Sequence, residues 1–275
     1  MSLKKTAIAL VAAATLALTG CASTPAETSG DALATITAGK LTIGTGLPAY
    51  EPWVVGDKPE SGEGFEAAVA YAVAEQLGFA KEDVVWVRTT FDEAIAPGAK
   101  NFDFNLQQYS ITEERKAAVD FSSAYYETTQ TVITAAGSKA ASATSIADLK
   151  GLLIGAATGT TSFAAIESVI KPTAGAKAFN SNDDAKAALA AGQIDALVVD
   201  LPTALYLTAV EIDGGKIVGQ LAGAGAGDQF GLVLDKGSKL TAAVSAAVDA
   251  LRESGKLQEI ADKWLADYAG APVLK

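Results

Sequence analysis

Charged and hydroxyl side chains stand at three places where a chain of alternating strands and helices positions ligand-binding residues. Arg115 carries a planar guanidinium, which can hold a carboxylate through two parallel hydrogen bonds. Residues 159–162, Gly-Thr-Thr-Ser, bring hydroxyls and backbone N–H groups to the predicted start of a helix, where an anion is favoured. Asp200 follows an apolar run and can accept an ammonium group. Together these residues suit a zwitterion.

Each of these residues also has an ordinary structural explanation. Arg115 can be a solvated helix residue, residues 159–162 can serve as an N-cap, and Asp200 can cap the helix that includes Pro202. Taken singly, the structural explanations are favoured. Only their combination indicates a binding site.

The residue types that are missing exclude several classes of enzyme. The chain has 275 residues, no His and one Cys. Ser-His-Asp and Cys-His catalysis, imidazole metal ligands and an intramolecular disulfide are therefore ruled out. The 21 Lys and Arg residues against 32 Asp and Glu give a net charge of −11, which disfavours nucleic acid as a partner. We expect no cofactor and no metal.

The N-terminal segment predicts export from the cytoplasm. Residues 1–20 combine Lys4 and Lys5 with an apolar run at 7–18 and small residues at the end, a pattern typical of a signal peptide. As a helix the run spans only about 18 Å, against about 30 Å of membrane hydrocarbon. A transmembrane helix is therefore not expected.

The only cysteine lies where this signal peptide would be cleaved. Residues 18–21, Leu-Thr-Gly-Cys, resemble the bacterial lipobox, so we expect Cys21 to be acylated and to become the new N-terminus. An unmodified free thiol is the alternative. Residues 21–35 are rich in small and polar side chains and are expected to form a flexible tether.

Apolar runs alternate with helical patterns along the rest of the chain. Strands are expected at residues 41–45, 84–87, 102–106, 152–156, 194–199 and 230–234. Helices are expected at residues 64–78, 91–96, 110–118, 145–149, 162–170, 183–191, 240–254 and 256–268. This alternation, in two similar rounds, predicts an α/β protein with two lobes and mostly parallel sheets.

Several motifs occur in an order and at separations that identify a family. They are Ser110-Ile-Thr-Glu-Glu-Arg115, Val119-Asp-Phe-Ser122, Tyr125-Tyr126, Asp148-Leu-Lys-Gly151, Gly159-Thr-Thr161, Ile194-Asp-Ala196 and Val199-Asp200. With these motifs the chain resembles the extracellular amino-acid-binding proteins of bacterial ABC importers, family 3. The resemblance covers residues 39–268. It implies a type II periplasmic-binding-protein fold, a two-lobed clamp with two hinge crossings.

The resemblance also implies a division of the chain and a set of roles. Lobe 1 is expected to comprise residues 36–129 and 229–275, and lobe 2 residues 130–228. Arg115 is expected to hold the α-carboxylate of a free amino acid and Asp200 its α-ammonium. The other expected contacts are Ser110, Thr160 and Thr161 near the carboxylate, and Tyr50 and Phe91 as aromatic walls.

Two departures from the family pattern bear on the ligand. Relatives that prefer basic amino acids carry an acid near Gly46 or Leu47, which this chain lacks, so a basic ligand is less expected. The positions just before Ser110 are usually small in the family, but here they are Gln107, Gln108 and Tyr109, which either hydrogen-bond a polar side chain or fill a smaller pocket. The choice between polar and small uncharged ligands stays open. Trp53 is expected to pack within a lobe rather than to bind the ligand.

The expected function is that of a lipid-anchored receptor outside the cytoplasm. As a monomer it would capture a free amino acid and deliver it to the permease subunits of an ABC importer, with the membrane reached through the lipid on Cys21. The periplasm and the cell surface both remain open. A dehydratase-like or wall-modifying enzyme on this scaffold is an alternative, and a sensor domain is another. An enzyme is disfavoured because no paired carboxylates, activated nucleophile or metal cluster is evident.

Overall fold

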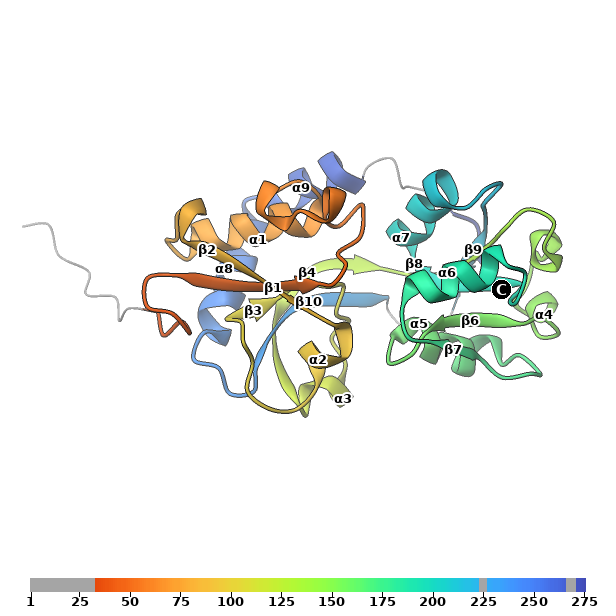
Figure 1. Cartoon of the computed structure of the whole chain (residues 1–275), viewed down its shortest axis with the longest axis horizontal. Coiled ribbons are helices and arrows are strands. Elements are labelled where there is room, and N and C mark those ends of the chain that lie inside the picture. Colours follow the sequence, from red (N-terminus) through yellow and green to blue (C-terminus); the bar gives the residue numbers. More distant parts are fainter. Residues whose placement is uncertain (1–32, 223–226, 266–270) are drawn as a thin grey trace, which may run out of the picture. The chain divides into compact units, whose positions relative to one another are not determined.

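The computed structural model describes residues 33–222, 227–265 and 271–275. The predicted signal peptide at residues 1–20, Cys21 and most of the tether lie outside these residues. Two β-sheets with flanking helices form two α/β lobes, as the sequence predicts (Figure 1). Among the described residues, no helix combines the length and apolar character needed to cross a membrane.

The sheet of the first lobe has the strand order β2-β1-β3-β10-β4. Its strands are β1 (Leu41–Gly46), β2 (Val84–Thr89), β3 (Phe104–Asn105), β4 (Val119–Thr128) and β10 (Asp228–Asp235). β1 runs parallel to β2 and β3, whereas β10 is antiparallel to β3 and β4. Every residue of β1 is buried, as expected for an interior strand covered on both faces.

The helices of the first lobe are α1 (Phe65–Gln76), α2 (Phe91–Ile95), α3 (Glu113–Lys116), α8 (Thr241–Glu253) and α9 (Lys256–Leu265). α1 packs against α8 and α9, and α8 also contacts β4 (Figure 1). α1 ends close to the predicted position because Gly78 adopts a left-handed φ of 85°. The amides of Gly78 and Phe79 then bond back to the last turn of the helix.

The sheet of the second lobe has the strand order β11-β9-β5-β8-β6-β7. Its strands are β5 (Gln130–Thr134), β6 (Ile154–Ala157), β7 (Lys177–Phe179), β8 (Ala196–Asp200), β9 (Lys216–Leu221) and β11 (Val273–Leu274). Its helices are α4 (Ile146–Leu149), α5 (Thr161–Ala165), α6 (Asn182–Ala190) and α7 (Leu201–Tyr206). α5 and α7 continue into π-helical turns at Ile166–Ile170 and Leu207–Glu211.

Both sheets are mostly parallel, as the sequence predicts, and in each sheet one strand runs against the others. The reversed strands, β10 in the first sheet and β5 in the second, are those that enter from the other lobe. β4 ends at Thr128 and β5 begins at Gln130, where the chain passes into the second sheet. β5 is antiparallel to both β8 and β9. β10 begins at Asp228, opposite Thr128, and brings the chain back into the first sheet. The two passages therefore lie side by side.

The C-terminal residues differ from the expected division. The sequence predicts that the first lobe extends through residue 275, but β11 pairs in parallel with β9 of the second sheet. Gly219 of β9 permits this approach, because a Cβ there would lie 2.7 Å from Leu274 Cγ and 2.8 Å from the Pro272 carbonyl oxygen. Leu274 is buried in the core of the second lobe, and this burial favours the pairing.

Two predicted elements are shorter than expected. The strand predicted at residues 102–106 contains only β3, and the helix predicted at 110–118 contains only α3. Ser110 instead forms a β-bridge with Phe230, and Thr112 caps α3 by accepting a hydrogen bond from the Arg115 amide. The chain before Thr112 is therefore extended. This conformation brings Ser110 and Arg115 to one side of the sheet's end.

Candidate functional site

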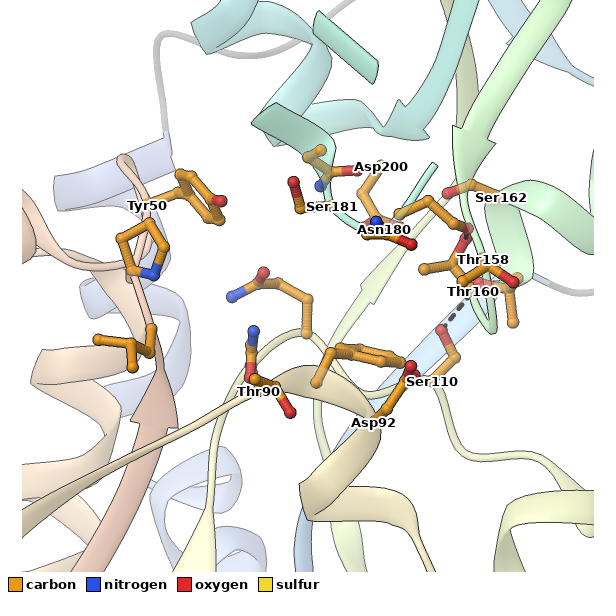
Figure 2. Close-up of a pocket in the computed structure, with 18 of the residues that line it drawn as sticks. Tyr50, Thr90, Asp92, Ser110, Thr158, Thr160, Ser162, Asn180, Ser181 and Asp200 are labelled. Carbon is orange, nitrogen blue, oxygen red and sulfur yellow. Dashed lines mark hydrogen bonds between the residues drawn. The ribbon is translucent and has the colours of Figure 1, made fainter. Parts of the chain in front are cut away.

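A cavity of about 190 Å³ is lined by residues from both lobes. Figure 2 shows Tyr50, Thr90, Asp92 and Ser110 of the first lobe facing Thr160, Asn180, Ser181 and Asp200 of the second. All nine residues that the sequence assigned to the ligand line this cavity, namely Tyr50, Phe91, Gln107, Gln108, Ser110, Arg115, Thr160, Thr161 and Asp200. The structure therefore brings the whole candidate set together.

The cavity lies at the carboxyl ends of β1, β2, β3, β6 and β8, because the lining residues follow these strands in the sequence. Local signals fix the loops there. Thr90 begins α2 with a capping box shared with Glu93, and this places Phe91 directly at the end of β2. Thr160 caps α5 by accepting a hydrogen bond from the Phe163 amide, at 3.1 Å. Thr160 and Thr161 thus sit at the start of a helix, as expected.

Arg115 is held by both lobes. Its Nη1 donates to the Ser110 carbonyl oxygen at 2.7 Å, and its Nη2 donates to the Gly159 carbonyl oxygen of the second lobe at 2.9 Å. The guanidinium also lies over the ring of Phe91, 5.2 Å from its centroid. Only 8% of Arg115 is exposed, and its burial lowers the pKa of the guanidinium while nearby Asp228 raises it. Arg115 is a buried, oriented cation rather than a solvated helix residue.

Hydroxyl groups from the two lobes meet beside this cation. Ser110 Oγ and Thr161 Oγ1 lie 3.1 Å apart (Figure 2). Thr161 Oγ1 also donates to Asp228 Oδ2 at 2.6 Å. The cavity wall next to Arg115 therefore carries two hydroxyls and one nearby carboxylate.

Asp200 ends β8 and is the residue before α7, but its side chain makes no capping hydrogen bond. Its Oδ1 instead accepts from Gln130 Nε2 at 2.9 Å, and the same nitrogen donates to Asp228. Burial and the neighbouring carboxylate of Asp228 raise the pKa of Asp200 to about 7. An acid in such surroundings gains from a cation placed in the cavity beside it.

Two residues of this network, Gln130 and Asp228, were missed by the sequence analysis. Gln130 is the first residue of β5, and Asp228 is the first residue of β10. The sequence did place the lobe crossings near Thr129 and Gln229. That signal could have identified their neighbours, because the two passages must lie next to the cavity between the lobes.

The aromatic residues form two different walls. Phe91 packs against Tyr109, with ring centroids 4.8 Å apart, and lies beneath Arg115. Tyr50 lies on the other side of the cavity (Figure 2) and its hydroxyl donates to Asp183 Oδ2 of the second lobe at 3.0 Å. Burial and the charge of Asp183 raise the pKa of Tyr50, so the phenol stays protonated at neutral pH.

Gln107 and Gln108 make different hydrogen bonds. Gln108 is in the left-handed region, with φ of 51°, and both its backbone N–H and its side-chain Nε2 donate to the buried carboxylate of Glu66. Gln107 Oε1 accepts from the hydroxyl of Tyr109 at 3.0 Å. Burial raises the pKa of Glu66 to about 7, although hydrogen bonds from Tyr125 and Gln108 lower it. Gln108 is thus turned toward the lobe interior.

Other polar residues of the cavity were not predicted. Asn180, Ser181 and Asn182 follow β7, a short strand of mostly exposed residues that has no apolar run to predict it. Thr90 and Asp92 flank Phe91, so the prediction of Phe91 already pointed to their loop. Trp53 is buried in the first lobe, as expected, against Phe65, Tyr126 and Phe230. No cluster of three or more Asp, Glu, Cys or His residues suitable for a metal occurs in the described part of the chain.

Comparisons with known proteins agree with this architecture. The family model for bacterial extracellular solute-binding proteins, family 3, matches residues 41–267. The L-arginine-binding protein of Pseudomonas aeruginosa is 33% identical over 225 residues, 78% of this chain and 84% of that protein. The ABC transporter glutamine-binding protein of Bacillus subtilis is 30% identical over 212 residues, 75% of each chain.

Solved structures lead to the same family. The structure of an ancestral arginine-binding protein bound to glutamine has a TM-score of 0.70 and 32% identity, covering 83% of this chain and 99% of that one. These relatives are binding proteins, and the present chain is likewise not an enzyme. The matched residues include every strand of the two sheets except β11, and all the residues that line the cavity. The chain belongs to the bacterial extracellular solute-binding proteins of family 3 and, within that family, to the amino-acid-binding proteins of ABC importers.

Proposed function

We propose that the cavity binds one free amino acid as a zwitterion. Arg115, with the hydroxyls of Ser110 and Thr161, receives the α-carboxylate, and Asp200 receives the α-ammonium. The observation that carries the proposal is the placement of a buried cation and an acid from different lobes around one cavity. Opposite charges at fixed positions recognise a zwitterion in a way that neither charge does alone.

The proposed ligand has an uncharged side chain, either polar or small. The named relatives bind arginine and glutamine, so the family by itself leaves the side chain undecided. The cavity lining contains Arg115 and only two acids, Asp92 and Asp200. If Asp200 pairs with the ammonium, little negative charge is left for a basic side chain.

The proposed protein is a monomer that is acylated at Cys21 and tethered to the outer face of the cytoplasmic membrane or to the cell surface. From there it delivers its ligand to the permease subunits of an ABC importer. The lipid anchor rests on the sequence of residues 18–21. The described residues begin at residue 33 and do not include Cys21, so the anchor needs its own test.

The proposal is tested by a thermal-shift screen of the soluble form, residues 36–275, against the free amino acids. A ligand at a thousand times its Kd stabilises the protein by about 4.1 kcal/mol, which gives a clear shift in Tm. Analogues of the best amino acid that lack the α-ammonium or the α-carboxylate should shift the Tm little. If no free amino acid shifts the Tm, or if both analogues act like the parent ligand, the proposal is wrong.

A further inference from the structure

The end of β1 leaves no room for a side chain on the cavity wall. A Cβ on Gly46 would lie 2.8 Å from the Pro48 carbonyl oxygen and 2.9 Å from Gln107 Nε2. Real Cβ atoms do not approach other atoms this closely, so the side chain of Gln107 already fills the space that a residue at position 46 would use. The chemical character of this part of the cavity therefore depends on the Gln107 amide.

A hydrogen bond from Tyr109 inside the first lobe fixes the orientation of the Gln107 amide. Its Oε1 accepts from the hydroxyl of Tyr109 at 3.0 Å, and Tyr109 is fully buried against Phe91. Because the oxygen is used by Tyr109, the amide presents its nitrogen to the cavity. Nε2 makes no hydrogen bond to another described residue, and the residue is only partly buried. Gln107 thus offers an N–H donor that is free to meet a ligand.

The main-cavity wall next to Gln107 is uncharged, and Glu66, which lines a smaller pocket with Gln107, already accepts hydrogen bonds from Gln108 and Tyr125. The neighbouring wall is formed by Leu47, Pro48 and Tyr50. The Tyr50 hydroxyl already donates a hydrogen bond to Asp183. Asp92 lies near Gly159 instead, and its Oδ1 is 3.2 Å from the position that a Cβ on Gly159 would take. The Gly159 carbonyl oxygen accepts a hydrogen bond from Arg115. Asp183 is paired with Lys186 at 3.0 Å, and neither residue lines the cavity.

From this arrangement we propose that Gln107 determines specificity by donating a hydrogen bond to the side-chain carbonyl of a carboxamide amino acid, glutamine or asparagine. The inference rests on the proposed function, because Arg115 and Asp200 must first fix the α-groups. A cationic side chain of a ligand has no acceptor to offer the Gln107 N–H donor, so both groups would stay unpaired. A carboxylate side chain would have no cation beside it at this wall. Such unpaired groups select against the wrong ligand as strongly as contacts select for the right one.

Calorimetry on the purified full chain tests this inference with glutamine, asparagine, glutamate, arginine and methionine. We expect glutamine or asparagine to bind at least tenfold more tightly than the other three. The variant Gln107→Glu places a carboxylate oxygen where Nε2 stood, with Tyr109 still donating to the other oxygen. It should weaken carboxamide binding about tenfold and strengthen arginine relative to glutamine.

Gln193→Glu is the matched control, because Gln193 is exposed and lies before β8, outside the cavity lining. It adds the same charge and should leave the ratio of the glutamine and arginine Kd values unchanged. Gln107→Met keeps the length of the side chain without any hydrogen-bonding group. It should abolish the preference for glutamine over methionine, and it serves as the test if Gln107→Glu does not fold.

The outcomes separate the two proposals. A parent protein that prefers a basic, acidic or apolar side chain would overturn the inference on Gln107, and so would a glutamine-to-arginine ratio that changes less than threefold in Gln107→Glu. In both cases the proposed amino-acid binding would survive. A parent protein that binds none of the free amino acids would instead contradict the proposed function.

Discussion

At the scale of single residues, the central feature is that the carboxyl groups of Asp200 and Asp228 share one amide donor, Nε2 of Gln130. The other atom of this amide, Gln130 Oε1, has no hydrogen-bond partner among the described residues, so the two acids orient the amide. Burial and the charge of Asp228 raise the pKa of Asp200 to about 7, whereas Gln130 and Arg115 lower it. Near neutral pH, Asp200 is therefore partly protonated until a cation arrives.

This pKa predicts that ligand affinity depends on pH. The α-ammonium needs the ionised form of Asp200, so it lowers the pKa of Asp200 in the complex and binding releases a proton below pH 7. Affinity should therefore fall as the pH drops from 8 to 6, by at most about tenfold per pH unit below the pKa. Calorimetry at both pH values, in buffers of different ionisation enthalpy, measures the affinity and the proton release together.

Asp200→Asn is the control for this dependence, because it keeps the shape of the side chain and removes the titrating group. Its weaker binding should vary little between pH 6 and pH 8. Equal affinities of the parent protein at the two pH values would show that Asp200 is already ionised in the free protein, against this explanation.

At the scale of elements, α7 is joined to the first lobe by a side-chain bond outside the main cavity. Trp53 Nε1 donates to Thr203 Oγ1 of α7 at 2.9 Å, and both residues are buried. α7 begins directly after Asp200, so Thr203 and Asp200 move together. The Trp53–Thr203 hydrogen bond therefore forms only when Asp200 is close to the first lobe. It stabilises the closed arrangement without touching the ligand.

Thr203→Val should therefore weaken ligand binding. The substitution keeps the volume of the side chain and leaves Trp53 Nε1 without its acceptor, at a cost of about 0.5–1.5 kcal/mol, or about 2- to 13-fold in Kd. Calorimetry with the best amino acid measures the change. Thr208→Val is the matched control, because the Thr208 hydroxyl bonds only to carbonyl oxygens one turn earlier. Equal effects of the two variants would contradict a role for the Trp53 bond.

The same scale shows what the sequence could predict and what it could not. Long periodic segments such as α1 and α8 and the buried strands β1 and β6 were predicted, because their apolar patterns are strong. β4 was recognised only through family motifs, because Val119–Thr128 mixes Asp, Ser and Tyr with apolar residues and buries every third residue rather than every second one. β9 and β11 depend on a pairing between distant segments, which no local pattern reveals.

The candidate site was predictable for a related reason. Its nine residues lie at strand ends and in a motif whose spacing is specific, so their meeting follows from the topology of parallel strands. Sequence alone did not show that Gln108 turns toward Glu66, because that contact joins residues 108 and 66 through the folded lobe. Nor did it show that Arg115 bonds to Gly159 of the other lobe.

At the scale of the whole molecule, contacts across the cavity hold the lobes together in this structure. They include the Arg115–Gly159, Ser110–Thr161 and Tyr50–Asp183 hydrogen bonds. A ligand that reaches Arg115 must enter while some of these contacts are broken. We therefore expect the free protein to sample an open form, with motion at the passages near Thr129 and Asp228.

X-ray scattering of the soluble form with and without ligand should show a smaller radius of gyration when the ligand is bound. The compaction follows because the bound zwitterion adds contacts that exist only when both lobes are close. Thr203→Val should shift the free protein toward the open form, and Thr208→Val should not. An unchanged radius of gyration, with binding proven by calorimetry on the same sample, would contradict the clamp.

The proposed anchor predicts that Cys21→Ser releases the protein from membranes while its ligand affinity stays unchanged. Each buried CH₂ of an acyl chain contributes about 0.8 kcal/mol to membrane binding, so a protein with several chains remains bound. Detergent-free fractionation of cells that express the parent protein or the variant measures the difference. A variant that remains with the membrane fraction as the parent does would show that another feature anchors the chain.

The central proposal is that Asp200 binds the α-ammonium of a zwitterion whose carboxylate is held by Arg115. The most direct test is calorimetry of the parent protein and Asp200→Asn, each with the best amino acid and with its deaminated analogue. Removing one partner of a buried charge pair costs about 2–5 kcal/mol, or about 30- to several thousand-fold in Kd. We expect this loss for the parent protein with the analogue and for Asp200→Asn with the amino acid, but little further loss when both changes are combined. Asp200→Asn binding the amino acid as tightly as the parent does would contradict it.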